Sequence, residues 1–166
     1  MIFETPRLKI RNLELNDFDP FHEMQSNPKV MQFTTGRPWT KEENKASLNK
    51  CINHYAQPGN NFWVWAGERK ADGEFIGTAA IVEENEIGYR FLEKYWGQGY
   101  GQEIADGLIN YAFGKLGVEK VIAFVEPENI GSVKILERTV LEFIKEYIHP
   151  DDGKLVRYYE LIRKPE

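Results

Sequence analysis

Cysteine and histidine are scarce in this sequence, and their scarcity excludes several kinds of site. The 166 residues contain one cysteine, Cys51, and three histidines, at positions 22, 54 and 149. A single cysteine forms no internal disulfide and no cysteine-rich zinc site, and the histidines are too scattered for metal-ligand spacing. Cys51 follows Leu48 in a predicted helix, so we interpret it as a packed hydrophobic residue rather than a nucleophile. We therefore expect no metal.

Long apolar runs and clusters of basic residues are also missing. No apolar run approaches the ~20 residues that a membrane span needs. The segment before residue 10 carries Glu4, Arg7 and Lys9 and does not look like a signal peptide. The formal net charge is -5 at pH 7, and without a basic stripe we expect no direct nucleic-acid partner. We expect a cytoplasmic protein that does not bind membranes, and its acidic character suits a cationic substrate such as an amine.

The remaining composition is that of an ordinary globular domain. Hydrophobic residues make up 42% and charged residues 28% of a chain without linker or repeat, so we predict a single domain over residues 1–166. Apolar patterns predict strands over 8–11, 62–68, 74–82, 86–92, 118–125, 143–148 and 156–162. Helical spacing and breakers predict helices between 17 and 27, between 40 and 57, over 99–114 and over 129–140.

The order of these elements indicates an α/β (α+β) sheet covered by helices. Thr40 and Glu43 form a capping box at the start of the second helix. We interpret 118–125 as a continuous apolar strand of the kind that is buried on both faces. Because a helix connects the strands at 86–92 and 118–125, we predict that these two strands are parallel.

A glycine-rich segment leads from the strand at 86–92 into the next helix. Residues 96–101 read Trp-Gly-Gln-Gly-Tyr-Gly, and glycine at alternate positions lets the backbone turn tightly and expose its amides. The first amides of a helix have no internal partner and the helix dipole makes that end positive, so the segment predicts an anion site for phosphate. It lacks both the spacing of the dinucleotide fingerprint and the Gly-Lys-Ser/Thr of the phosphate-binding loop. The alternative is a turn that binds nothing.

The same segment resembles the GNAT family, the GCN5-related N-acetyltransferases. The family signature is Gln or Arg, two residues, Gly, one residue, and Gly or Ala; Gly99 and Gly101 match its last two positions. Trp96 departs from its first position. Residues 95–101 instead fit, at every position, the RimJ/RimL branch, which acetylates the N-termini of ribosomal proteins.

The resemblance extends over nearly the whole chain. Residues 5–11 and 86–89 look like the opening and fourth strands of the branch, and Asn129 with Ser132 looks like its Asn-x-x-Ser helix start. Residues 138–143 depart from its Lys-Leu-Gly-Phe pattern, so we expect that turn to be built differently. The resemblance implies a GNAT-like fold with a mixed, mainly antiparallel seven-stranded sheet, helices on both faces, and splayed fourth and fifth strands.

For ligands, the resemblance implies acetyl-coenzyme A as acetyl donor. Its pantetheine arm would lie between the splayed strands, where Phe91 and Leu92 would offer backbone groups and an amide would stabilise the oxyanion. Asn129 would cap its helix and contact the same arm. Lys134 and Arg138 would reach the adenosine 3′-phosphate or remain solvated. The amides expected at the pyrophosphate are those of Gln98, Gly99, Tyr100, Gly101 and Gln102.

Two side chains are candidates for the proton transfers. Glu86 opens the strand that leads to the thioester, so it is the candidate general base, acting through water; the alternative is a merely charged turn. An N-terminal α-amine has a pKa of roughly 7.7–8.0, so about a tenth of it is neutral at pH 7 and a strong base is less necessary. Ser132 is, by resemblance, the candidate proton donor to the leaving sulfur, or else a helix cap.

These features predict an acetyl-CoA-dependent N-acetyltransferase that works by direct attack in a ternary complex. The resemblance favours the N-terminal α-amine of a ribosomal protein as acceptor. The alternatives are a polyamine or aminoglycoside, which a small acid-lined pocket would indicate, and a non-catalytic acyl-CoA sensor. A homodimer is a further expectation. The tryptophans at 39, 63, 65 and 96 are interpreted as core residues, with Phe33 and Trp39 as an alternative lining of the acceptor groove.

Overall fold

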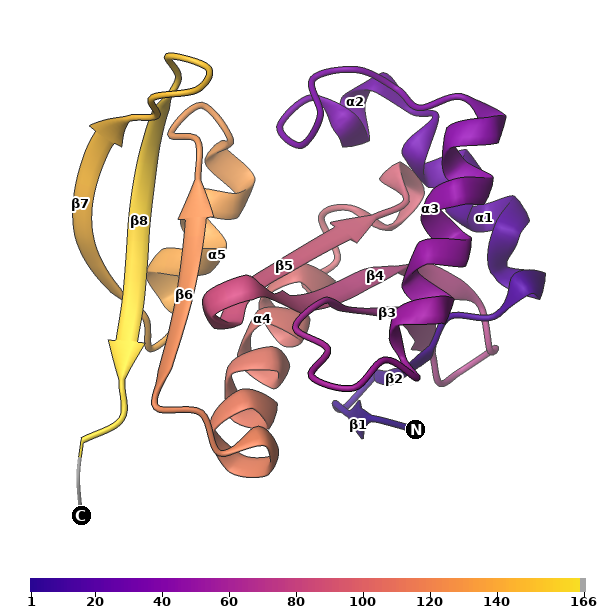
Figure 1. The fold of residues 1–166 in the computed structure, drawn as a ribbon, viewed down its shortest axis with the longest axis horizontal. Coiled ribbons are helices and arrows are strands. Elements are labelled where there is room, and N and C mark those ends of the chain that lie inside the picture. Colours follow the sequence, from indigo (N-terminus) through magenta and orange to yellow (C-terminus); the bar gives the residue numbers. More distant parts are fainter. Residues whose placement is uncertain (165–166) are drawn as a thin grey trace.

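The computed structural model describes residues 1–164. In that part of the chain an eight-stranded sheet runs in the order β1-β2-β3-β4-β5-β6-β8-β7, and helices cover it on both faces (Figure 1). Neighbouring strands are antiparallel except β5 and β6. The strands are β1 Phe3–Glu4, β2 Leu8–Asn12, β3 Trp63–Arg69, β4 Phe75–Val82, β5 Glu86–Phe91, β6 Lys120–Val125, β7 Glu142–Ile148 and β8 Leu155–Ile162.

The helices divide between the two faces of this sheet. They are α1 Phe18–Gln25, α2 Pro28–Met31, α3 Lys41–His54, α4 Tyr100–Tyr111 and α5 Ile130–Arg138, with 3-10 turns at Leu15–Asp17, Glu83–Asn85 and Glu93–Tyr95 and a π-helical turn at Ala112–Leu116. Consecutive residues of a strand point to opposite faces. In β5, Arg90 bonds to Gln25 of α1, whereas Tyr89 bonds to Ser132 of α5. The helices α1 and α5 therefore lie on opposite faces, α1 packed with α3 and α5 with α4.

The predicted order of elements is confirmed, with two additions. The sheet has eight strands rather than seven, because the short β1 pairs with β2. The second addition is α2, at a place where Asn27-Pro28 predicts only the end of a helix. Asn27 Oδ1 accepts the amide of Lys29 at 2.9 Å, so an N-cap followed by proline starts a new turn. The capping box at α3 is confirmed, with Glu43 N donating to Thr40 Oγ1 at 3.2 Å.

The strands β5 and β6 diverge. Register pairs join β4 to β5 from Gly77↔Phe91 to Val82↔Glu86, whereas β5 and β6 share the single pair Glu86↔Ile122. The predicted parallel pairing and the predicted splay are both confirmed. The gap opens toward the carboxyl ends of the two strands, from which the chain leads into α4 and α5 (Figure 1).

The end of α5 is built without glycine, as the unusual sequence there predicts. Thr139 adopts an extended backbone, its Oγ1 donates to Leu136 O at 2.7 Å, and it accepts the Leu141 amide at 3.2 Å. The threonine hydroxyl thus satisfies groups that a left-handed glycine usually arranges at a helix end.

The tryptophans do not all belong to the core. Trp65 is 2% exposed, and Trp39 and Trp63 pack against the core. Trp96 is 46% exposed, so its interpretation as a core residue is wrong. Its indole Nε1 donates to Phe91 O at 3.0 Å, which holds the ring at the edge of the β5–β6 gap rather than beneath the sheet. Among residues 1–164 no helix combines the length and the apolar character that a membrane crossing requires.

Candidate active site

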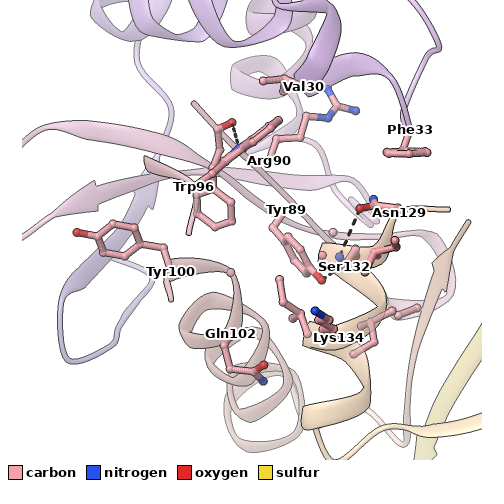
Figure 2. A pocket seen from close by; sticks show the side chains of 18 of the residues that line it. Val30, Phe33, Tyr89, Arg90, Trp96, Tyr100, Gln102, Asn129, Ser132 and Lys134 are labelled. Atoms are coloured by element: carbon pink, nitrogen blue, oxygen red, sulfur yellow. Dashed lines mark hydrogen bonds between the residues drawn. The ribbon is translucent and has the colours of Figure 1, made fainter. Parts of the chain in front are cut away.

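The gap between β5 and β6 widens into a cleft of about 860 Å³. Its walls come from β5 and β6, from the loop and first turn of α4, from α5 along its length, and from α2 with the segment after it (Figure 2). Two predicted site residues, Leu92 and Gln98, are not among the residues that line the cleft. The predicted site residues that do line it are Glu86, Phe91, Gly99, Tyr100, Gly101, Gln102, Asn129, Ser132 and Lys134.

The glycine loop presents a run of backbone amides. Gly97 and Gly99 have φ angles of +73° and +84°, left-handed conformations that glycine adopts without strain. Gly99 is the N-cap of α4, and the first helical bond there runs from Glu103 N to Gly99 O at 3.2 Å. The amides of residues 97–102, that of Gln98 included, have no acceptor within the described chain. A pyrophosphate would meet these donors at the positive end of α4, so the loop fits the expected group.

Gly101 and Gln102 continue this surface along α4. A Cβ on Gly101 would lie 2.5 Å from Ile135 Cδ1, so α4 and α5 approach closely here, with the tip of one side chain between them. The buried Oε1 of Gln102 has no partner among residues 1–164. An orphaned acceptor beside the cleft suits an N–H donor of a ligand. Lys134 of α5 lines the same region (Figure 2).

Thr5 and Arg7 hold the glycine loop and the start of α4 through contacts that the sequence does not predict. Glu103 accepts hydrogen bonds from Thr5 Oγ1 at 2.6 Å and from Arg7 N and Nε, both at 2.7 Å. Arg7 Nη1 also donates to Gln98 O at 2.9 Å, and its guanidinium lies over the Tyr100 ring. Burial opposes the charge of Glu103, but the hydrogen bonds from Thr5 and Arg7 outweigh it and lower the pKa of Glu103. The likeness of the opening strand to the family is the only sequence signal for this contact.

The edge of β5 that faces the gap carries the backbone groups expected there. In an antiparallel pair, residues alternate between bonding to the partner strand and facing away from it. Leu92 N donates to Ile76 O at 3.0 Å, so Tyr89 and Phe91 turn their backbone groups toward β6. Leu92 O accepts the Tyr95 amide at 2.9 Å. Leu92 therefore uses both of its backbone groups within the chain, contrary to expectation, and it is Tyr89 that turns its backbone groups toward the gap beside Phe91.

Ser132 meets Tyr89 across the cleft, with 3.1 Å between the two hydroxyl oxygens. The cap of α5 is Asn129, whose Oδ1 accepts the Ser132 amide at 3.3 Å, so the Ser132 hydroxyl is not used as a cap (Figure 2). Burial raises the pKa of Tyr89 to about 12, while its hydrogen bond with Ser132 acts the other way. The sequence does not predict the role of Tyr89, because Tyr89 meets Ser132 only where α5 packs beside β5 in the folded chain.

Glu86 lies at the closed end of the gap, where it pairs in register with Ile122. Burial, followed by the charge of Glu84, raises the pKa of its carboxyl group. A raised carboxyl pKa suits a general base at neutral pH. Glu86 precedes Tyr89 by three positions, roughly 10 Å along the strand. At that separation Glu86 reaches an amine beside Tyr89 only through water.

The wall formed by α2 and the following segment combines apolar side chains with the guanidinium of Arg90. Val30 and Phe33 line the cleft here, whereas Trp39 does not. Arg90 extends toward this wall, away from Gln102 (Figure 2). The charged residues that line the whole cleft are Lys29, Glu86, Arg90, Lys134 and Arg138.

Other reactive groups lie outside this site. No cluster of His, Cys, Asp and Glu in residues 1–164 is arranged to hold a metal ion. Cys51 is 3% exposed, and burial raises the pKa of its thiol to about 11, so it is a packed residue as predicted.

Comparison with known proteins identifies the family. Residues 7–140 match the acetyltransferase (GNAT) domain family. The uncharacterized N-acetyltransferase p20 of Bacillus licheniformis is 34% identical, over 93% of this chain and 91% of its own length.

Solved structures share the fold. A GNAT-family acetyltransferase from Bacillus anthracis superimposes with a TM-score of 0.84 at 23% identity, over 96% of both chains. Spermidine N-acetyltransferase from Vibrio cholerae, in complex with CoA and spermine, has a TM-score of 0.79 at 19% identity, over 94% of this chain and 95% of that chain. The match of residues 7–140 to the family and the 34% identity to p20, together with the open amides of the glycine loop beside a splayed pair of strands, show that the chain belongs to the GNAT family and is an acetyltransferase.

Proposed function

We propose that this enzyme transfers the acetyl group of acetyl-CoA to the N-terminal α-amine of a protein. The observation that supports this acceptor is the charge of the cleft. On the wall formed by α2, where the acceptor would enter, the charged residues that line the cleft are Lys29 and Arg90; Glu86, at the closed end of the gap, is the one acidic residue among the described residues that line it. A polyamine or an aminoglycoside carries several positive charges and needs complementary acidic groups. A peptide N-terminus brings a single amine, and the RimJ/RimL resemblance of residues 95–101 favours the same acceptor.

Backbone donors hold most of the acetyl donor in this proposal. The amides of residues 97–102 bind the pyrophosphate, and Asn129 and Gln102 border the pantetheine arm. Lys134 and Arg138 reach toward the adenosine 3′-phosphate. Charges farther away than ~8–10 Å are largely screened at physiological salt, so the net charge of -5 does not prevent binding of an anionic ligand.

The residues around the gap divide the chemistry between them. Acetyl-CoA supplies the thioester and leaves as a thiol. The Phe91 amide stabilises the negative charge that develops on the carbonyl oxygen. Glu86 accepts, through water, the proton that the amine nitrogen loses as its bond to carbon forms. Ser132 gives its hydroxyl proton to the sulfur as the carbon–sulfur bond breaks, the Tyr89 hydroxyl replaces that proton, and water in the cleft returns a proton to Tyr89.

Thiol release from acetyl-CoA, measured with a panel of amines, tests this function. The panel contains peptides with ribosomal-protein N-termini, spermidine and an aminoglycoside. We expect the highest kcat/KM for peptides with a free α-amine, and no release with the same peptides N-acetylated beforehand. A higher kcat/KM for spermidine or the aminoglycoside would overturn the proposed acceptor. Cofactor binding in calorimetry without turnover on any amine would indicate the sensor instead.

The homodimer stays a prediction. The edge strand β7 exposes Phe143, Ile144 and Ile148 by 54%, 44% and 60%, and a second copy would cover apolar surface there. Light scattering distinguishes a particle of twice the 19.3 kDa chain mass, which would support the dimer, from a particle of one chain mass, which would contradict it.

A further inference from the structure

Arg90 presents a positive charge to the cleft without a negative partner. Its Nη1 donates to Gln25 Oε1 at 2.6 Å, and no carboxylate of residues 1–164 lies within 4.0 Å of its guanidinium. Lys29, the other cation on this wall, is already paired with Glu93 at 3.0 Å. The Nε and Nη2 groups of Arg90 make no hydrogen bond within the described chain. They remain available to a ligand.

A chain of neutral groups holds this guanidinium in place. Gln25 is 3% exposed and Asn44 is 0% exposed. Because Gln25 Oε1 accepts from Arg90, Gln25 Nε2 is the donor to Asn44 Oδ1, at 2.9 Å. Asn44 Nδ2 then donates to His22 Nδ1 at 2.8 Å and to Trp39 O at 3.3 Å. The network orients Arg90 without neutralising it.

The position of Arg90 is unfavourable for an unpaired charge. Arg90 is half-buried and lines the cleft, and burial lowers its pKa, so the charged form loses solvation that the hydrogen bond to Gln25 replaces only in part. A buried charge held only by a neutral amide is costly. The planar guanidinium fits a carboxylate through two parallel hydrogen bonds, the geometry for which arginine is best suited. A ligand carboxylate would supply the missing partner.

Arg90 also lies on the α2 side of the cleft, the side from which the acceptor would enter, whereas acetyl-CoA would bind on the side of α4 and α5, the donor side. Its neighbours Tyr89 and Phe91 turn toward the donor side, where Tyr89 contacts Ser132. Arg90 points to the opposite face of the sheet, toward Val30 (Figure 2). An acceptor that enters along α2 therefore places its amine in the gap and any nearby anionic group on Arg90.

We propose that Arg90 is an anion subsite that selects acceptors with a carboxylate close to the reactive amine. The inference rests on the proposed function and names its substrate class: N-terminal peptides with an acidic side chain in the first residues. The same chemistry recognises the α-carboxylate of a free amino acid, which is the second source to be tested. The unpaired cation argues against a polycationic acceptor.

The test compares peptides that differ in one group, Ser-Glu-, Ser-Gln- and Ser-Lys- N-termini on a common sequence. Hydrogen bonds to charged groups predict a kcat/KM about 10- to 100-fold higher for the Glu peptide than for the Gln peptide, with the Lys peptide lowest. In Arg90→Gln the Glu-to-Gln ratio falls to about one while turnover of the Gln peptide persists. Arg90→Lys, which keeps the charge but not the paired geometry, retains part of the ratio. Lys29→Met, which removes a cation already paired with Glu93, keeps the full ratio.

A second measurement does not depend on turnover. Calorimetry with CoA present compares binding of the N-acetylated Glu and Gln peptides to the wild type and to Arg90→Gln. Tighter binding of the Glu product by the wild type alone supports the subsite even if the proposed function fails. Equal binding of both products by the wild type, or a preference that survives in Arg90→Gln, overturns it. Arg90-dependent acetylation of free glutamate without peptide turnover supports the subsite and overturns the protein acceptor.

Discussion

The hydroxyl of Tyr89 lies 3.1 Å from that of Ser132, and the two side chains reach the donor side of the cleft from β5 and α5. Burial raises the pKa of Tyr89 to about 12, so its phenol is protonated at neutral pH. The cap of α5 is Asn129, whose Oδ1 accepts the Ser132 amide, and the Ser132 hydroxyl contacts Tyr89 instead. We expect this pair to deliver the proton that the leaving sulfur takes up.

Ser132→Ala removes the group that we place next to the sulfur. We expect kcat to fall by about 100-fold, the lower end of the range for a general acid, and the acetyl-CoA Kd to stay within about twofold, because the binding donors are backbone amides. Tyr89→Phe, which leaves the serine in place, should cost less. Ser132→Thr is the matched control that keeps a hydroxyl. Steady-state kinetics with calorimetric Kd values separates the two effects; an unchanged kcat in Ser132→Ala excludes the acid role.

Glu86→Gln removes the candidate base and should change the shape of the pH–rate profile. Burial and Glu84 raise the pKa of Glu86 above its ordinary value of 4.5. The unprotonated base is lost as pH falls through this raised pKa, in addition to protonation of the amine. Log kcat/KM of the wild type should therefore approach a slope of 2 at low pH, and that of Glu86→Gln a slope of 1. Glu84→Gln should shift the wild-type bend to lower pH. Superimposable profiles would remove Glu86 from the mechanism.

Gly99→Ala and Gly101→Ala test two different demands on the loop. Gly99 has a φ of +84°, and the left-handed conformation costs a side chain about 1–2 kcal/mol. A Cβ there would also lie 3.3 Å from Arg7 Nη2. We expect Gly99→Ala to weaken acetyl-CoA binding by about tenfold.

Gly101→Ala should be much milder, because only Ile135 Cδ1, the end of a flexible side chain, has to move. Alanine also favours a helix over glycine by up to about 1 kcal/mol, which offsets the strain. Calorimetry and thermal unfolding compare the two variants. Similar losses of acetyl-CoA binding in both variants would show that the left-handed backbone of Gly99 is not what makes glycine necessary there.

Glu103→Gln weakens the hydrogen bonds by which Thr5 and Arg7 hold the start of α4. Hydrogen bonds from Thr5 and Arg7, working against burial, lower the pKa of Glu103 below its ordinary value of 4.5. Its stabilising contribution is present above the unfolded pKa and is lost as pH falls through the lowered folded pKa. The wild type should thus lose acetyl-CoA affinity only in acid, as pH falls through this lowered pKa.

The size of this effect is limited by solvent. Arg7 is 45% exposed, so solvent screens its ion pair with Glu103. We therefore expect loss of this ion pair to raise the acetyl-CoA Kd by about twofold to fivefold at neutral pH. Glu103→Gln should show that loss with no further step in acid, and Lys70→Gln, which removes an exposed pair with Glu4, should leave Kd unchanged. An acid step retained in Glu103→Gln would point to another carboxylate.

Features that depend on neighbours along the chain could be predicted from the order of the amino acids. The Thr40 capping box, the glycines at 97 and 99 and the alternating strands act over a few residues, so their structural meaning is local. The family and its acetyl donor follow from one such segment, residues 95–101. The splay of β5 and β6 was predictable only through the resemblance.

Which side chains meet across the cleft depends on the three-dimensional fold. Tyr89 instead of Leu92 faces the gap because antiparallel pairing alternates along β5, and a shift of one residue exchanges the two. The contacts of Arg7 with Glu103 and of Arg90 with Gln25 join residues 96 and 65 positions apart. No local pattern encodes such contacts, because they depend on how the sheet orders its strands and which helix covers each face.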